Sequence, residues 1–145
     1  MTKQDAAEAV LAAKHATDVT WSELAELAAK PEVWTTAALL GQHPIDRDTA
    51  NRIAARLELD EEVSDALTRQ PYRATSTEQL SDPTIYRLQE LVLVYGAAIK
   101  ELIHEKFGDG IMSAINFSMT LDRVERDGEP RVQITLDGKY LPYQW

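Results

Sequence analysis

Two charged side chains, Arg87 and Glu90, lie three residues apart in one segment of the chain. In a helix this spacing places both on one face, so the guanidinium and the carboxylate can meet. The ordinary interpretation is a solvated ion pair. An apolar run, residues 91–99, follows directly, and it places the pair at a buried edge or a subunit seam. In such a place the planar fork of an arginine suits carboxylate-like anions.

Ser113 is the third candidate for chemistry. It follows a Gly-Asp-Gly turn at residues 108–110, where its hydroxyl and its backbone amide are possible donors to a ligand. Taken alone, it is an ordinary turn serine. A nucleophilic triad is not predicted, because no serine lies in a nucleophile elbow and no histidine can be assigned to a serine as its base.

The sequence predicts no metal site and no phosphate loop. His104 and Glu105 begin like the HExxH zinc motif, but Gly108 stands where the second histidine is required. His15 and His43 show no ligand spacing. The Gly-Asp-Gly turn lacks the length and the lysine of a P-loop. The chain has no cysteine, which excludes disulfides, thiolate catalysis and Cys-ligated zinc.

A long helix must position the charged pair. Asp82 is a cap and Pro83 suits the first turn of a helix predicted over residues 84–107, ended by Gly108. Residues 91–99 are apolar on every face, so we expect this helix to be buried on several sides, within the fold or against another subunit. Gly96 within the run predicts that another backbone packs closely there.

Beyond the turn the periodicity changes from helix to strand. Apolar residues alternate with smaller or polar ones over residues 115–121 and again over 132–136. Asp127-Gly128 between the two runs indicates a hairpin, with a loop expected to be longer than two residues. Two strands and one helix cannot close a core. We therefore expect a second copy of the chain to complete this half and to interlock with it.

The first half is predicted as a bundle of short helices, over residues 5–15, 21–30, 32–40, 46–57 and 61–68. Thr20 and Glu23 form a capping box, Pro31 suits the first position of the third helix, and Gly41 suits its left-handed cap. The second and third helices resemble a repressor-type helix-turn-helix. DNA binding is the alternative function, but residues 32–40 offer no Arg, Lys, Asn or Gln to a base edge.

Composition limits the remaining possibilities. The chain has 145 residues, 44% of them hydrophobic, and a formal net charge of −9, which opposes binding to nucleic acid. No apolar run approaches the length of a membrane span and no signal-like segment begins the chain, so a cytoplasmic location is expected. The fold class predicted is α+β, with a helical bundle over residues 1–75 and a second domain over 76–145.

From residue 82 to the end, the chain strongly resembles the C-terminal domain of cyanases. The most specific stretches are HEKFGDGIMSAINF at residues 104–117 and ITLDGKYLP at 134–142. The first half resembles the family more loosely, for example in TTAALLGQ at residues 35–42. The connector and the last three residues match the family least, and no role is assigned to them.

The resemblance implies a lyase that decomposes cyanate with bicarbonate, through carbamate, to ammonia and carbon dioxide. It implies a cofactor-free enzyme, with bicarbonate as co-substrate, that assembles from dimers into a decamer with active sites between subunits. The family's catalytic residues fall on Arg87, Glu90 and Ser113, and its lining residues on Ile111 and Leu141. Whether Glu90 orients Arg87 or assists proton transfer stays open, as does the choice between detoxification and nitrogen supply.

Overall fold

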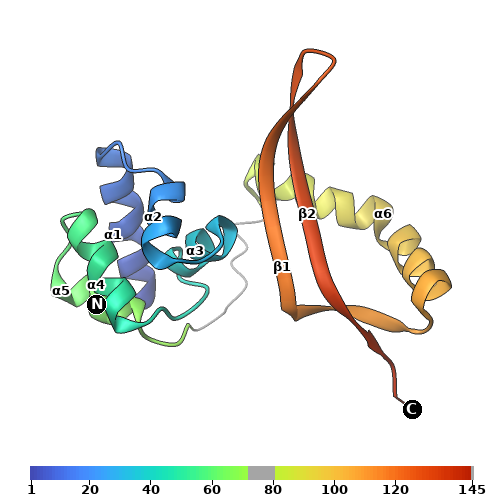
Figure 1. Ribbon diagram of the computed structural model, residues 1–145, viewed down its shortest axis with the longest axis horizontal. Helices are drawn as coiled ribbons and strands as arrows, with labels where there is room; N and C mark the ends of the chain where they lie inside the picture. Colours follow the sequence, from blue (N-terminus) through green and yellow to red (C-terminus); the bar gives the residue numbers. More distant parts are fainter. Residues whose placement is uncertain (72–80, 145) are drawn as a thin grey trace. The chain divides into compact units, whose positions relative to one another are not determined.

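The chain joins a helical bundle to a long helix and a β-hairpin (Figure 1). The computed structural model describes residues 1–71 and 81–144. In this part of the chain six helices precede two strands, which form a two-stranded antiparallel sheet. The predicted α+β class is therefore confirmed. The predicted domain boundary between residues 75 and 76 lies outside the described residues and stays a prediction.

Five short helices form the bundle. They are α1 (Lys3–Ala16), α2 (Trp21–Ala28), α3 (Glu32–Leu39), α4 (Arg47–Arg56) and α5 (Glu61–Leu67). Helix α2 packs against α3 and α4, while α5 packs against α1 and α4. Their apolar faces meet in one core whose largest fully buried apolar side chains are Leu24, Leu39, Ile53, Leu67, Val10 and Val19. Burial of each such side chain contributes about 1.5–3 kcal/mol, so this core accounts for the stability of the bundle.

Side-chain caps set where these helices begin. The predicted capping box of α2 is present: Thr20 Oγ1 accepts from the Glu23 amide at 3.1 Å, and Glu23 accepts from the Thr20 amide at 2.8 Å. Asp46 caps α4 by accepting from the Thr49 amide at 2.9 Å. The prediction for Pro31 was one position off, because Pro31 is the N-cap residue of α3 and not its first helical residue. Gly41 has the expected positive φ of 93°.

Helix α6 (Pro83–Phe107) is the longest element, and it begins and ends as predicted. Asp82 accepts from the amides of Thr84 at 2.8 Å and Ile85 at 3.1 Å, and Gly108, with φ of 99°, ends the helix. No residue of α6 is buried within the chain. The apolar run at its centre is exposed, with Leu93 73% accessible. The sequence analysis expected this helix to be buried either within the fold or against another subunit. The described part of its own chain does not bury it.

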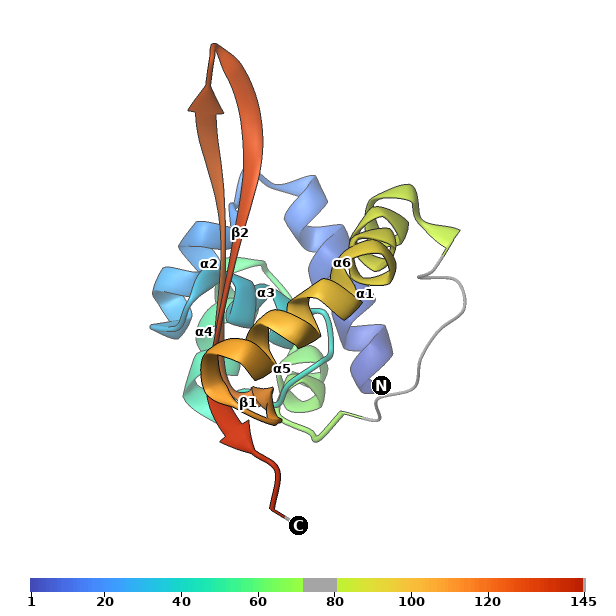
Figure 2. The same cartoon turned by 90° about the vertical axis from the view of Figure 1, so that its right-hand side faces the viewer.

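Strands β1 (Gly110–Arg126) and β2 (Glu129–Pro142) form the hairpin, seen from two sides in Figures 1 and 2. The expectation of a loop longer than two residues was wrong. Asp127 and Gly128 alone connect the strands, with φ of 55° and 78°. Positive φ at both positions is the type I′ geometry whose twist matches that of a hairpin. Both strands are also longer than the alternating runs suggested.

The two halves differ in burial. Among residues 81–144, only Gly110 and Ser113 are buried. The described residues fall into two compact units, residues 1–71 with 119–135 and residues 81–118 with 136–144. In the described ranges 1–71 and 81–144, no helix has both the length and the apolar character needed to cross a bilayer.

Candidate active site

Arg87 and Glu90 meet near the start of α6, as their spacing predicted. Arg87 Nη1 donates to Glu90 Oε2 at 2.6 Å, and the two side chains are 75% and 46% exposed. An ion pair this exposed contributes between about 0 and 1 kcal/mol to folding, so it does little for stability. Glu90 is the sole hydrogen-bond partner of Arg87 among the described residues. A guanidinium has five N–H donors, so most of this one remains available to an anion.

Ser113 is held in a different way, at the start of β1. Ser113 is buried, with 7% of its surface accessible. Its Oγ accepts hydrogen bonds from the amides of Ile115 at 3.1 Å and Asn116 at 2.9 Å. A hydroxyl oxygen has two acceptor lone pairs, and both are used here. What the hydroxyl retains is its hydrogen, for which the described residues offer no acceptor. Ser113 is therefore set up to donate a hydrogen bond to a ligand and not to act as a nucleophile.

The two predicted lining residues lie on the paired ends of the strands. Ile111 is 45% exposed and lines a pocket of about 310 Å³. Leu141 is 38% exposed, and its carbonyl oxygen lies against Gly110. The pocket is largely apolar, and its other lining residues are Ile103, Phe107, Met112, Leu136, Asp137, Gly138 and Tyr140.

The turn between α6 and β1 is anchored by two tyrosines that the sequence analysis did not single out and by His104, which it considered only as a metal ligand. The Tyr140 hydroxyl donates to the Asp109 carbonyl at 3.2 Å, and the Tyr143 amide donates to the same oxygen at 3.0 Å. His104 Nε2 lies 3.3 Å from the Gly110 carbonyl oxygen. These contacts tie Asp109 of the turn to the end of β2, and the last turn of α6 to the start of β1. The resemblance stretch ITLDGKYLP contains Tyr140, but only proximity in space reveals this use of its ring.

The structure does not bring all the candidate residues together within one chain. Arg87 and Phe107 are separated by about 30 Å along α6, given a rise of 1.5 Å per residue. Ser113 follows the far end of this helix and makes no hydrogen bond to Arg87 or Glu90 in the described part of the chain. A site that uses both Arg87 and Ser113 therefore cannot form within one chain as described. A second copy of the chain can bring the Ser113 of one subunit to the Arg87 of the other.

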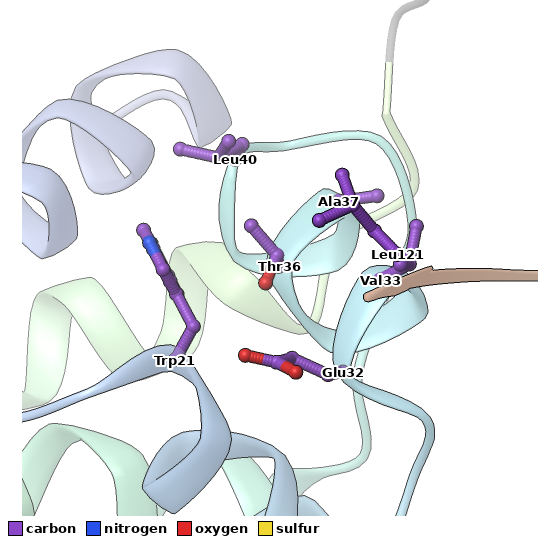
Figure 3. Close-up of a pocket in the computed structure, with 7 residues that line it drawn as sticks. All are labelled: Trp21, Glu32, Val33, Thr36, Ala37, Leu40 and Leu121. Carbon is purple, nitrogen blue, oxygen red and sulfur yellow. The ribbon is translucent and has the colours of Figure 1, made fainter. Parts of the chain in front are cut away.

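The outer surface of α3 bears on the DNA-binding alternative. Glu32, Val33, Thr36 and Ala37 of this helix line a pocket of about 400 Å³, together with Trp21, Leu40 and Leu121 (Figure 3). The lining is apolar apart from Glu32 and Thr36. Base edges and phosphates are read by Arg, Lys, Asn and Gln, and α3 has none of them. The alternative is not favoured.

Fold and site together define an α+β protein in which a helical bundle precedes a helix and a hairpin that carry the hydrogen-bond donors of Arg87 and Ser113. The family model described as Cyanate lyase C-terminal domain matches residues 77–145, and that described as Cyanate hydratase, N-terminal, matches residues 3–71. The chain belongs to the cyanate hydratase (cyanate lyase) family.

Relatives and a solved structure agree with this membership over the whole chain. A cyanate hydratase of Mycolicibacterium vanbaalenii is 49% identical over 146 residues, which cover 100% of this chain and 95% of the relative. One of Pseudomonas savastanoi pv. phaseolicola is 49% identical over 143 residues, covering 98% and 92%. The crystal structure of cyanase from T. urticae superimposes with a TM-score of 0.80 at 38% identity, covering 94% of this chain and 96% of that one.

Proposed function

We propose that this chain is a lyase that decomposes cyanate with bicarbonate. Its membership of the cyanate hydratase family is the observation that carries this proposal. The geometry supports it, because Arg87 and Ser113 both retain donors for small anions. Both substrates carry a negative charge, so bringing them together is the difficult step, and a fixed cation with oriented donors offsets their repulsion.

The reaction follows from the chemistry of the two anions. A bicarbonate oxygen forms a bond to the cyanate carbon, and the bicarbonate proton passes to the cyanate nitrogen. The resulting adduct carries two negative charges. The bond between the bicarbonate carbon and the bridging oxygen then breaks, which releases carbon dioxide and, with uptake of one proton, carbamate. Carbamate takes up another proton and falls apart to ammonia and a second carbon dioxide.

Each candidate residue has a role in this scheme. Arg87 binds the anions and stabilises the doubly charged adduct, while Ser113 donates its hydroxyl hydrogen to one of them. Glu90, at 2.6 Å from Arg87, either orients the guanidinium or assists proton transfer. Ile111 and Leu141 shape the walls. Bicarbonate supplies both the nucleophile and a proton, so the scheme requires no metal and no cofactor.

Self-association belongs to the same proposal. Residues 91–99 of α6 are exposed in the single chain apart from the half-buried Gly96, and Arg87 and Ser113 lie toward opposite ends of the helix. A second copy that covers α6 would bury its apolar surface and bring the Ser113 of one subunit toward the Arg87 of another. Dimers of this kind, interlocked through α6 and the hairpin and grouped into a decamer, are the assembly we propose, located in the cytoplasm.

The direct test is ammonia release from cyanate by the purified, chelator-treated protein, with and without added bicarbonate. We expect ammonia production that depends on bicarbonate and is unchanged by the chelator. A folded, assembled sample that releases no ammonia under either condition would contradict the proposed reaction. Activity that disappears with the chelator and returns with a metal would contradict the cofactor-free scheme.

A further inference from the structure

Gly138 of β2 lies against the backbone of Ser113. A Cβ atom at position 138 would lie 2.5 Å from the Ser113 carbonyl oxygen and would overlap the side chain of Met112. The φ of Gly138 is outside the left-handed region, so its conformation does not require glycine. What requires glycine here is space, because ordinary contact between two such atoms needs about 3.4 Å or more.

The register of the hairpin shows why the strands come so close at this point. An unbroken antiparallel ladder from the two-residue turn would place Phe117 opposite Gly138. Gly138 instead lies against Ser113, four residues nearer the start of β1. Four residues of β1 must therefore be taken up between Ser113 and the turn.

The backbone just after Ser113 shows how some of these residues are accommodated. The amides of Ile115 and Asn116 both turn back to the Ser113 hydroxyl oxygen. Figure 1 shows β1 bending sharply near its start. Ser113 is thus clamped on two sides: its Oγ accepts from two amides of its own strand, and its carbonyl oxygen fills the space that a Cβ at position 138 would need.

From this clamp we infer that Gly138 is a positioning residue for Ser113 in the proposed cyanate reaction. The effect of Gly138 on catalysis rests on the proposed function. The close approach of Gly138 to the Ser113 backbone does not depend on that function. Any side chain at position 138 requires the Ser113 carbonyl and the position 138 backbone to move apart by about 1 Å. A displacement of this size at a reacting group can lower a rate about a hundredfold.

The test compares Gly138→Ala with the wild-type chain in its assembled form. We expect kcat/KM for cyanate to fall at least tenfold while circular dichroism and assembly mass stay unchanged. A second measurement reports on Ser113 itself: hydrogen exchange at the amides of Ile115 and Asn116. We expect exchange there to rise at least tenfold in Gly138→Ala, toward the value in Ser113→Ala, where the hydroxyl acceptor is missing.

Met112→Ala supplies the matched control. It removes the side-chain overlap at position 138, so Met112→Ala/Gly138→Ala retains only the contact with the Ser113 carbonyl. If Gly138→Ala fails to fold, this double variant takes its place, with Met112→Ala as its reference. We expect the double variant to stay at least tenfold below that reference.

Three results would overturn the inference. They are kcat/KM within twofold of the reference, unchanged exchange at both amides, or recovery of the Gly138→Ala activity when Met112 is truncated. The last result would show that side-chain packing, and not the Ser113 backbone, needs the space. A wild-type chain without cyanate activity would refute the proposed function alone, because the exchange measurement would still test the contact between Gly138 and Ser113.

Discussion

Arg87 and Ser113 both offer hydrogen-bond donors, but Arg87 is exposed to solvent and Ser113 is buried. The guanidinium of Arg87 is exposed in the single chain and uses one donor on Glu90. The hydroxyl of Ser113 is buried, and its acceptor capacity is used by two backbone amides. The exposed ion pair of Arg87 adds little to folding stability, whereas the two hydrogen bonds that Ser113 Oγ accepts do hold the local backbone. The donors left over, on the guanidinium and on the hydroxyl, are the groups to which the proposed function assigns an anion.

Substitution of Arg87 tests its role at this scale. We expect Arg87→Leu to lower kcat/KM for cyanate by about a hundredfold to a thousandfold, the effect of removing a donor to developing negative charge. Arg87→Lys keeps the charge but loses the planar fork, so its loss should be intermediate. Steady-state ammonia release at fixed bicarbonate measures both, and light scattering should show the wild-type mass.

Arg123 of β1 is the matched control. Its side chain is 76% exposed, close to the 75% of Arg87, and it lies 3.8 Å from Glu125. We expect Arg123→Leu to keep kcat/KM within twofold of the wild type. If Arg87→Leu behaves in the same way as this control, the guanidinium of Arg87 has no part in the reaction.

Residue types and local spacing predicted part of this site. The three-residue spacing of Arg87 and Glu90 predicted their contact, because helical geometry alone determines it. The hydrogen bonds of Ser113 were not predicted, although its Oγ accepts from amides only two and three residues further along the chain, a local pattern that serine favours. What the sequence could not show is that this pattern lies within β1, beside the close contact with Gly138 of β2.

At the scale of the elements, carboxylates at the N-termini of the bundle helices make the stability of the bundle depend on pH. The amides of Thr2, Thr20 and Thr49 lower the pKa of Asp5, Glu23 and Asp46 respectively, because each amide donates a hydrogen bond to the charged carboxylate. A carboxylate with a lower pKa in the folded state stabilises that state at a pH above its ordinary pKa. The stabilisation is lost as the pH falls through the folded-state value.

We therefore expect the thermal midpoint of the protein to fall as the pH drops below the ordinary values of 4.5 for Glu and 3.8 for Asp. Asp46→Asn retains an N-cap acceptor but cannot titrate, so its midpoint should fall less steeply than that of the wild type. Thermal melts followed by circular dichroism between about pH 6 and pH 3 measure this difference.

Asp48, an exposed acid in the first turn of the same helix, is the control for this prediction. It caps nothing, so Asp48→Asn should keep the wild-type slope. Equal slopes for Asp46→Asn and the wild type would show that this cap does not contribute to the acid sensitivity of the bundle.

At the scale of the whole molecule, the exposed centre of α6 is the feature that a single chain leaves unexplained. Val92, Leu93, Val94 and Tyr95 are between 58% and 73% exposed. An apolar surface that is contiguous over several residues is typical of an interface. Gly96 within it is partly buried, with Val92 as the one side chain near its missing Cβ, so the predicted close backbone has no counterpart within the described chain.

We expect the purified chain to be an oligomer at micromolar concentration, and Leu93→Glu to lower its mass, because a charge buried in an apolar interface is costly. Light scattering coupled to size exclusion measures this mass. Leu11→Glu on α1 is the control: Leu11 is 36% exposed on a largely polar surface, and its substitution should leave the mass unchanged. A monomeric wild-type chain would contradict the proposed assembly.

The sequence by itself determined the local elements of this protein and the types of its candidate site residues. Caps, helix ends and the α+β order depend on interactions between residues a few positions apart, which is why Thr20, Asp82 and Gly108 could be interpreted without coordinates. Family membership was likewise carried by contiguous stretches, HEKFGDGIMSAINF above all. The tertiary structure alone decided the shifted register beside Gly138 and the exposure of α6. These features depend on how long the paired strands are and on what surface remains uncovered, and both are set by contacts between residues distant in the chain.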